Sequence, residues 1–235
     1  MKVAIMQPYF VPYIGYFQLI AAVDLFVLHD RVKYVKKGWI NRNRILQDGS
    51  DAVISLPISH DSDTLDIRDR RVAPDFDRDR LLNRVREAYR KAPCFQQTMP
   101  LVESIVRHED ADLFQYLRHG VSCVCEHLGI STPIVPASTI AIDHSLRAQD
   151  KVIALAKAAG ADTYVNAIRG MELYSAESFR EAGLRLRFLR SRPFEYPQFG
   201  KPFVPWLSIV DVLMFNPVAA IREQLTTGYE LIVNE

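Results

Sequence analysis

The sequence predicts an α/β domain built on a doubly wound, mostly parallel sheet of five strands. Short apolar runs typical of buried strands alternate with segments of helical periodicity along the chain. The first three elements form a βαβ unit, which implies parallel pairing and a right-handed crossover. A length of 235 residues suits one large domain with a sizeable core.

The chain begins with this βαβ unit. Residues 2–6 read as a buried strand, and residues 13–23 have apolar side chains at helical spacing. Residues 24–28 form a second short apolar strand.

A hairpin and three helices follow, and we interpret residues 39–129 as an insertion in a single domain of residues 1–235. Polar and apolar side chains alternate over residues 39–46, a Gln-Asp-Gly-Ser turn follows, and residues 52–58 return as a strand. Residues 59–74 are polar and are expected to be an exposed connection. Helices are expected over 75–91, 95–107 and 110–128.

The second half returns to alternating strands and helices. Strands are predicted at 133–137, 163–166 and 184–189, and helices at 146–159, 175–181, 207–213 and 217–226. In the order 3-2-1-4-5 the first strand is central, which is a Rossmann-like arrangement. Its carboxyl end then opens at the switch point, where such sheets bind ligands.

Composition excludes several classes of partner. Lys plus Arg number 29 against 28 Asp plus Glu, so no overall field favours nucleic acid or an anionic membrane. No apolar run reaches the ~20 residues of a membrane span. Three cysteines indicate a reducing compartment, and we expect a cytoplasmic protein. The sequence has no zinc pattern, so no metal ligands are predicted.

The loop after the first strand reads "MQPYFVPYIGYFQLI", and we expect it to form one wall of a small-molecule site. Gln7 can pair with an amide or a hydroxyl, and Tyr9, Tyr13 and Tyr16 offer ring faces and O–H donors. Gly15 allows close approach of a ligand near the start of the helix. The alternative is that the rings only pack the loop onto the sheet.

Polar residues also follow the second strand and occupy the hairpin. His29 and Asp30 are the candidate catalytic bases. Asn41, Arg42 and Arg44 are candidate substrate-binding residues, because an arginine pair suits phosphate or carboxylate. Asn41 and Asn43 alternate with Arg42 and Arg44 along the strand, so the asparagine pair and the arginine pair cannot both serve one ligand without a bulge. A charged edge strand is the alternative.

The remaining candidates follow the third and fourth strands. Ser138, Asn166, Gly170 and Tyr174 are expected to converge with Gln7 on the switch-point edge. Tyr196 and Gln198 are expected to close the rim. Lys151 is expected on the surface, and Ser208 and Asp211 are expected to be structural.

The segment Phe10-x-Pro12-Tyr13-x-Gly15-Tyr16 resembles the first-strand loop of nucleotidylyltransferases and pantothenate synthetase. In those enzymes the pattern is His-x-Gly-His, and the imidazoles hold ATP phosphates. Here Tyr13 and Tyr16 would replace both histidines, and a phenol cannot carry positive charge. The similarity concerns the fold, and the use of ATP with magnesium is left open.

Four blocks resemble the WbqC-like protein family: "MQPYFVPYIGYFQLI", "WINRNRIL", "GADTYVNAIRGMELYSAESFREAGLRLRFL" and "YPQFGKPFVPWLSIVDVLMFN". The family occurs in gene clusters for bacterial O-antigen and other surface polysaccharides, and glycine transfer to a sugar has been suggested for it. Lys33 and Arg169 depart from the family's usual Gln and Gly, so the ligand is free to differ.

The resemblance implies an enzyme of surface-polysaccharide biosynthesis that transfers an aminoacyl group, such as glycine, to an amino sugar or sugar nucleotide. Two alternatives stay open: an ATP-dependent ligase or nucleotidylyltransferase, and a non-catalytic sugar-nucleotide-binding protein. The expected partner is a small molecule, neither nucleic acid nor membrane, and a homodimer is left open.

Overall fold

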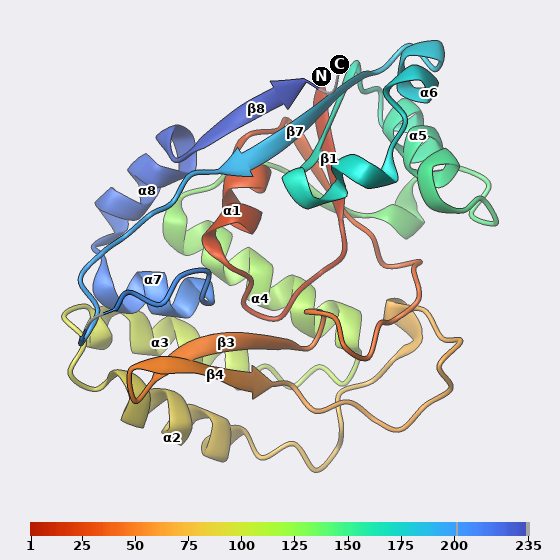
Figure 1. The fold of residues 1–235 in the computed structure, drawn as a ribbon. Helices are drawn as coiled ribbons and strands as arrows, with labels where there is room; N and C mark the ends of the chain where they lie inside the picture. Colours follow the sequence, from red (N-terminus) through yellow and green to blue (C-terminus); the bar gives the residue numbers. More distant parts are fainter. Residues whose placement is uncertain (201, 234–235) are drawn as a thin grey trace.

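The computed structural model describes residues 1–200 and 202–233, and its centre is a six-stranded sheet (Figure 1). The strand order is β5-β2-β1-β6-β7-β8, and only the last pair is antiparallel. The strands are β1 (Lys2–Met6), β2 (Leu25–Leu28), β5 (Ile134–Pro136), β6 (Thr163–Ala167), β7 (Arg185–Ser191) and β8 (Tyr229–Val233).

Helices cover both faces of this sheet. α1 (Ile14–Ala21) and α8 (Val218–Thr227) lie on one face, and α5 (Ala148–Ala158) and α6 (Ala176–Glu181) lie on the other. Alternate residues of β1 supply the two cores: Ala4 belongs to the cluster with α1, and Val3 and Ile5 belong to the cluster with α5. This alternation is the period of two expected of a strand buried on both sides.

A separate hairpin and three helices lie below the sheet in Figure 1. The hairpin consists of β3 (Arg42–Gln47) and β4 (Ser50–Ser55), and the helices are α2 (Arg78–Tyr89), α3 (Phe95–Val106) and α4 (Leu113–Leu128). The short α7 (Ile209–Phe215) packs against α3. One continuous apolar cluster joins the hairpin, these helices and the α1 face of the sheet.

The predicted α/β class and the mostly parallel sheet are confirmed, with two corrections. The sheet has six strands, because residues 229–233 pair with β7 at its outer edge. The segment 59–74 is not wholly exposed: Ile67, Arg70 and Val72 are buried, and Ile58 pairs with Val72 in an isolated bridge. No helix in the described ranges is long and apolar enough to cross a membrane.

The carboxyl ends of the parallel strands point toward the hairpin (Figure 1). Loops that follow β1, β2, β6 and β7 therefore meet between the sheet and β3. Three 3₁₀ segments lie among the connections, at Ile67–Asp69, Ala137–Thr139 and Ile168–Leu173.

Candidate functional site

A cavity of about 1280 Å³ lies at the carboxyl edge of the sheet. Residues that follow β1, β2, β6 and β7 line it, together with residues of the hairpin, the start of α5 and Trp206. Parallel sheets bind ligands at this edge. The sequence predicted a site here because polar residues follow several strands.

The loop after β1 is fixed to the hairpin and to α7. The Asn43 amide donates hydrogen bonds to the carbonyl oxygens of Phe10 (3.1 Å) and Val11 (3.0 Å). The Ser208 hydroxyl donates a third bond to the Val11 carbonyl, at 2.6 Å. Val11 has a φ of 38°, which a β-branched residue rarely adopts, so these bonds hold the loop in a strained conformation.

The predicted loop residues Gln7, Tyr9, Tyr13, Gly15 and Tyr16 all line the cavity. The buried Tyr16 hydroxyl donates to the Gln7 carbonyl at 2.9 Å, and its ring lies 5.5 Å from that of Tyr9. Burial, and to a smaller extent the neighbouring Tyr13, raises the pKa of Tyr9 to about 12. These phenols are therefore neutral donors at physiological pH.

Gly15 leaves space that other side chains need. A Cβ at this position would lie 2.3 Å from the Tyr13 ring and 2.5 Å from the Ser191 hydroxyl. Any larger residue would push Tyr13 or Ser191 out of place. Gly15 therefore sets where Tyr13 stands in the cavity.

The opposite wall is formed by Asn166, Gly170 and Tyr174, as the sequence predicted. The Asn166 side-chain oxygen accepts a hydrogen bond from Ala167 N at 2.8 Å, which orients the amide. A Cβ at Gly170 would lie 2.4 Å from Asn166 Nδ2, so the glycine makes room for that amide. Tyr174 packs edge-on to Tyr164 of β6, with the ring centroids 5.8 Å apart.

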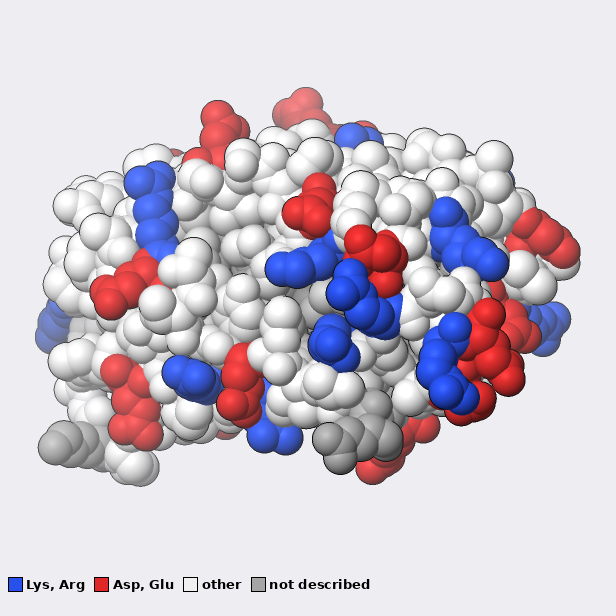
Figure 2. All heavy atoms as spheres, turned by 90° about the horizontal axis from the view of Figure 1, so that it is seen from above, with Lys and Arg blue, Asp and Glu red and all other residues white. Residues whose placement is uncertain are grey.

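The cavity wall is strongly cationic, although the whole chain carries a formal charge of +1. Asp66 is the one acidic side chain among its described lining residues. Basic side chains come from every side of the cavity: Arg31, Lys33, Arg44, Arg147, Lys151, Arg169 and Arg190. Elsewhere charges are mixed, and the face in Figure 2 shows acidic and basic side chains interspersed.

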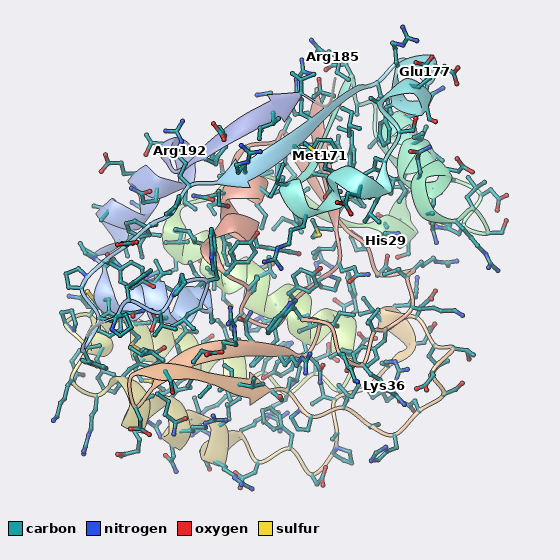
Figure 3. All side chains as sticks on the ribbon, in the orientation of Figure 1. His29, Lys36, Met171, Glu177, Arg185 and Arg192 are labelled. Carbon is teal, nitrogen blue, oxygen red and sulfur yellow. The ribbon has the colours of Figure 1, made fainter. Side chains whose placement is uncertain are left out.

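His29 lines the cavity below α5 and above the hairpin (Figure 3). Burial lowers its pKa to about 4, and the Lys151 and His144 charges act in the same direction against an opposing Asp30. The imidazole is therefore neutral at pH 7. Its Nδ1 is buried without a hydrogen-bond partner among the described residues.

Lys151 was expected on the surface, and this prediction was wrong. It is 8% exposed, it lines the cavity, and its Nζ donates to the Arg31 carbonyl at 2.8 Å. Burial lowers the pKa of the ammonium, partly offset by Asp66. The first turn of α5 directs this lysine back toward β2.

Four predicted site residues lie outside the cavity lining. Asp30 is 1% exposed and accepts hydrogen bonds from Ser138 N (2.9 Å) and Arg68 (3.4 Å). These bonds tie the end of β2 to the turn after β5 and to the 3₁₀ segment Ile67–Asp69. Asp30 and Ser138 therefore bind each other and have a structural role.

Asn41 and Arg42 also have internal partners. Asn41 accepts a hydrogen bond from the Tyr34 hydroxyl at 2.8 Å and donates to the Leu56 carbonyl at 2.7 Å. Arg42 donates to the Gly38 and Lys37 carbonyls. Asn43 and Arg44, the next polar residues along β3, line the cavity instead.

Tyr196 and Gln198 do not close the rim, contrary to the prediction. Both donate to the buried Asp211 carboxylate, at 2.7 and 3.0 Å, and Tyr89 donates to its other oxygen at 2.7 Å. Burial raises the pKa of Asp211, although the hydrogen bonds from these three donors act to lower it. Asp211 is structural as expected, and so is Ser208, which caps α7 through Val210 N.

Several lining residues were not among the predicted site residues, namely Arg31, Lys33, Trp39, Arg147 and Trp206. Arg31 and Lys33 follow β2 within five residues, so the strand-end rule that selected His29 could have found them. Arg147 and Trp206 lie in connections whose position no local pattern indicates. Among the described residues, no group of three or more His, Cys, Asp or Glu side chains is placed to hold a metal ion.

The model of the WbqC-like protein family matches residues 7–223, which include all the loops of this cavity. The chain belongs to this family. A Mycobacterium tuberculosis (strain ATCC 25618 / H37Rv) relative, described as uncharacterized protein Rv1507c, is 28% identical over 227 residues. The similarity covers 95% of this chain and 97% of that relative. No solved structure matches the chain.

Proposed function

We propose that this WbqC-like protein binds a sugar nucleotide in the cavity and transfers an aminoacyl group, such as glycine, to the amino sugar. The product would serve the biosynthesis of a bacterial surface polysaccharide, as the family resemblance implies. The observation that carries the proposal is the cationic wall of the cavity.

Seven Lys or Arg side chains face one Asp in this wall. Charge-assisted hydrogen bonds contribute about 1.5–3 kcal/mol each, and micromolar affinity needs about 8 kcal/mol, so at least three to five of them are required for a diphosphate. Arg44 and Arg190 already pair with Asp51 and Glu230, at 3.2 and 3.1 Å. The other five basic side chains have no acidic partner among the described residues, and a neutral sugar would not supply one. A diphosphate would supply the anionic oxygens that these five side chains lack.

His29 is the proposed general base. In the transfer, the amine nitrogen of the sugar attacks the carbonyl carbon of a carboxyl-activated amino acid. ATP would activate the carboxyl as an acyl phosphate or adenylate. A C–N bond forms, the bond from that carbon to the phosphate or AMP oxygen breaks, that anion leaves, and the amine proton passes to the His29 imidazole. The neutral state of His29 at pH 7 supports this role. A bound diphosphate would raise its pKa toward the working pH, because it offsets Lys151 and His144.

The experiment is a mass-spectrometric assay of purified protein with glycine, ATP, magnesium and a UDP-linked amino sugar. The expected result is a product heavier by one glycyl group, which His29→Gln reduces about 100-fold or more. His60→Gln is the matched control, because His60 is exposed and lies outside the cavity lining. Binding of the sugar nucleotide without any product would overturn the transferase and leave a binding protein.

A further inference from the structure

The two tryptophans of the chain both line the cavity and are both partly open to solvent. Trp39 is 39% exposed and Trp206 is 46% exposed. Indole rings usually bury most of their large apolar surface. Two open indoles at one cavity mouth therefore offer a surface for a flat ligand group.

Arg44 connects the two tryptophans. Its guanidinium carbon lies 5.6 Å from the centre of the Trp39 ring, and its Nη2 donates to the Trp206 carbonyl at 3.2 Å. Arg42 lies at 5.5 Å from the same Trp39 ring. The Arg44 contacts thus hold Trp39 and the Trp206 backbone relative to each other. The two guanidinium groups cover part of the Trp39 ring, and both tryptophans still keep more than a third of their surface exposed.

Tyr13 extends this aromatic rim toward the first-strand loop. Its ring stands edge-on to Trp206, with the centroids 6.1 Å apart. Trp206 has a φ of 58°, a left-handed conformation that a bulky residue rarely adopts. Two backbone bonds just after it, from Ser208 N to Arg44 O and from Ile209 N to Pro12 O, hold the chain there. Strain of this kind persists where the surrounding structure imposes it, often at ligand sites.

We propose that Trp39, Trp206 and Tyr13 form a stacking site for the base of a nucleoside diphosphate. This inference rests on the proposed function. It adds that the mouth of the cavity binds the base of the sugar nucleotide. The base would lie on the indoles, and the diphosphate would extend inward past Arg169, whose charge acts on Tyr13, to the buried Lys151. Stacking accepts any base, because every base has a π face.

The test uses tryptophan fluorescence and calorimetry with UDP, GDP, inorganic pyrophosphate and glucosamine 1-phosphate. Since both tryptophans lie at the cavity, stacking reports directly in the emission. UDP and GDP should quench the emission and bind about 5- to 150-fold more tightly than pyrophosphate, the range expected for base stacking. Trp39→Ala and Trp206→Ala should each reduce the advantage of UDP and GDP over pyrophosphate, while Trp39→Phe should keep most of it.

Phe199→Ala is the matched control, because Phe199 is 50% exposed and lies outside the cavity lining. Equal affinity for UDP, GDP and pyrophosphate would overturn the stacking site but leave the anion site of the proposed function standing. Quenching by glucosamine 1-phosphate alone would assign the rings to a sugar and also overturn it. Binding of none of the four probes would overturn the proposed function as well. Should Trp206→Ala fail to fold, Trp39→Ala decides.

Discussion

Asn43→Ala removes the side chain that fixes the first-strand loop to the hairpin. The residue is 6% exposed, donates to two loop carbonyls at 3.1 and 3.0 Å, and accepts from Arg44 N at 2.9 Å. Each lost bond costs about 0.5–1.5 kcal/mol, and more where a buried group stays unpaired. Ser208 still serves the Val11 carbonyl, so we expect a total loss of about 2–3 kcal/mol.

The assay is urea unfolding, read as the midpoint shift at constant m-value, followed by titration with UDP. Asn43→Ala should lower both stability and UDP affinity, because the loop that carries Gln7 and Tyr13 loses its anchor. Asn41→Ala is the matched control. It removes two hydrogen bonds just before the same strand, and Asn41 lies outside the cavity lining. It should cost about 1–2 kcal/mol of stability and leave UDP affinity unchanged. Equal effects of both substitutions on affinity would refute the reasoning.

Further predictions concern single groups in the cavity. Tyr13→Phe should weaken UDP binding by about 0.5–1.5 kcal/mol in calorimetry with an unchanged thermal midpoint; a lower midpoint with unchanged binding would mean that the ring only packs the loop. The folded-state pKa of His29, about 4, lies below the unfolded value, so stability should fall as pH drops from about 6.5 to 4. His29→Gln should remove about 2–3 kcal/mol of that loss in urea unfolding at pH 4.5, and an unchanged pH dependence would contradict the buried neutral state. Lys151→Met should raise the His29 pKa in an NMR titration, because the ammonium lowers it; an unchanged or lower value would contradict the assigned charge effect. Gly170→Ala should weaken UDP binding because its Cβ would displace the Asn166 amide, and full affinity would place that amide outside the ligand contacts.

Local pattern predicted most of the fold. The helices and the five parallel strands have strong periodicity, and their observed bounds differ from the expected ones mainly by lost ends. For example, the helix expected over 75–91 is Arg78–Tyr89, which begins after the Asp77 cap. The strand β8 was missed because its apolar run is short and follows a helix directly. Only its pairing with β7 makes it a strand.

The cavity lining was predictable where polar residues directly follow a strand. Gln7, His29 and Asn166 were found by this rule, because the carboxyl ends of parallel strands share one edge. Asp30 meets the same rule but turns away to Ser138, which no local pattern indicates. The anchoring role of Asn43 depends on partners more than thirty residues away in sequence, so it required the folded structure.

A crystal structure with a bound UDP-linked amino sugar tests the central claim most directly. We expect the diphosphate oxygens within hydrogen-bond distance of the Lys and Arg side chains of the cavity. We also expect the sugar amine within reach of His29. A ligand bound elsewhere on the molecule, or one in the cavity with its phosphates directed to bulk solvent, would contradict this claim.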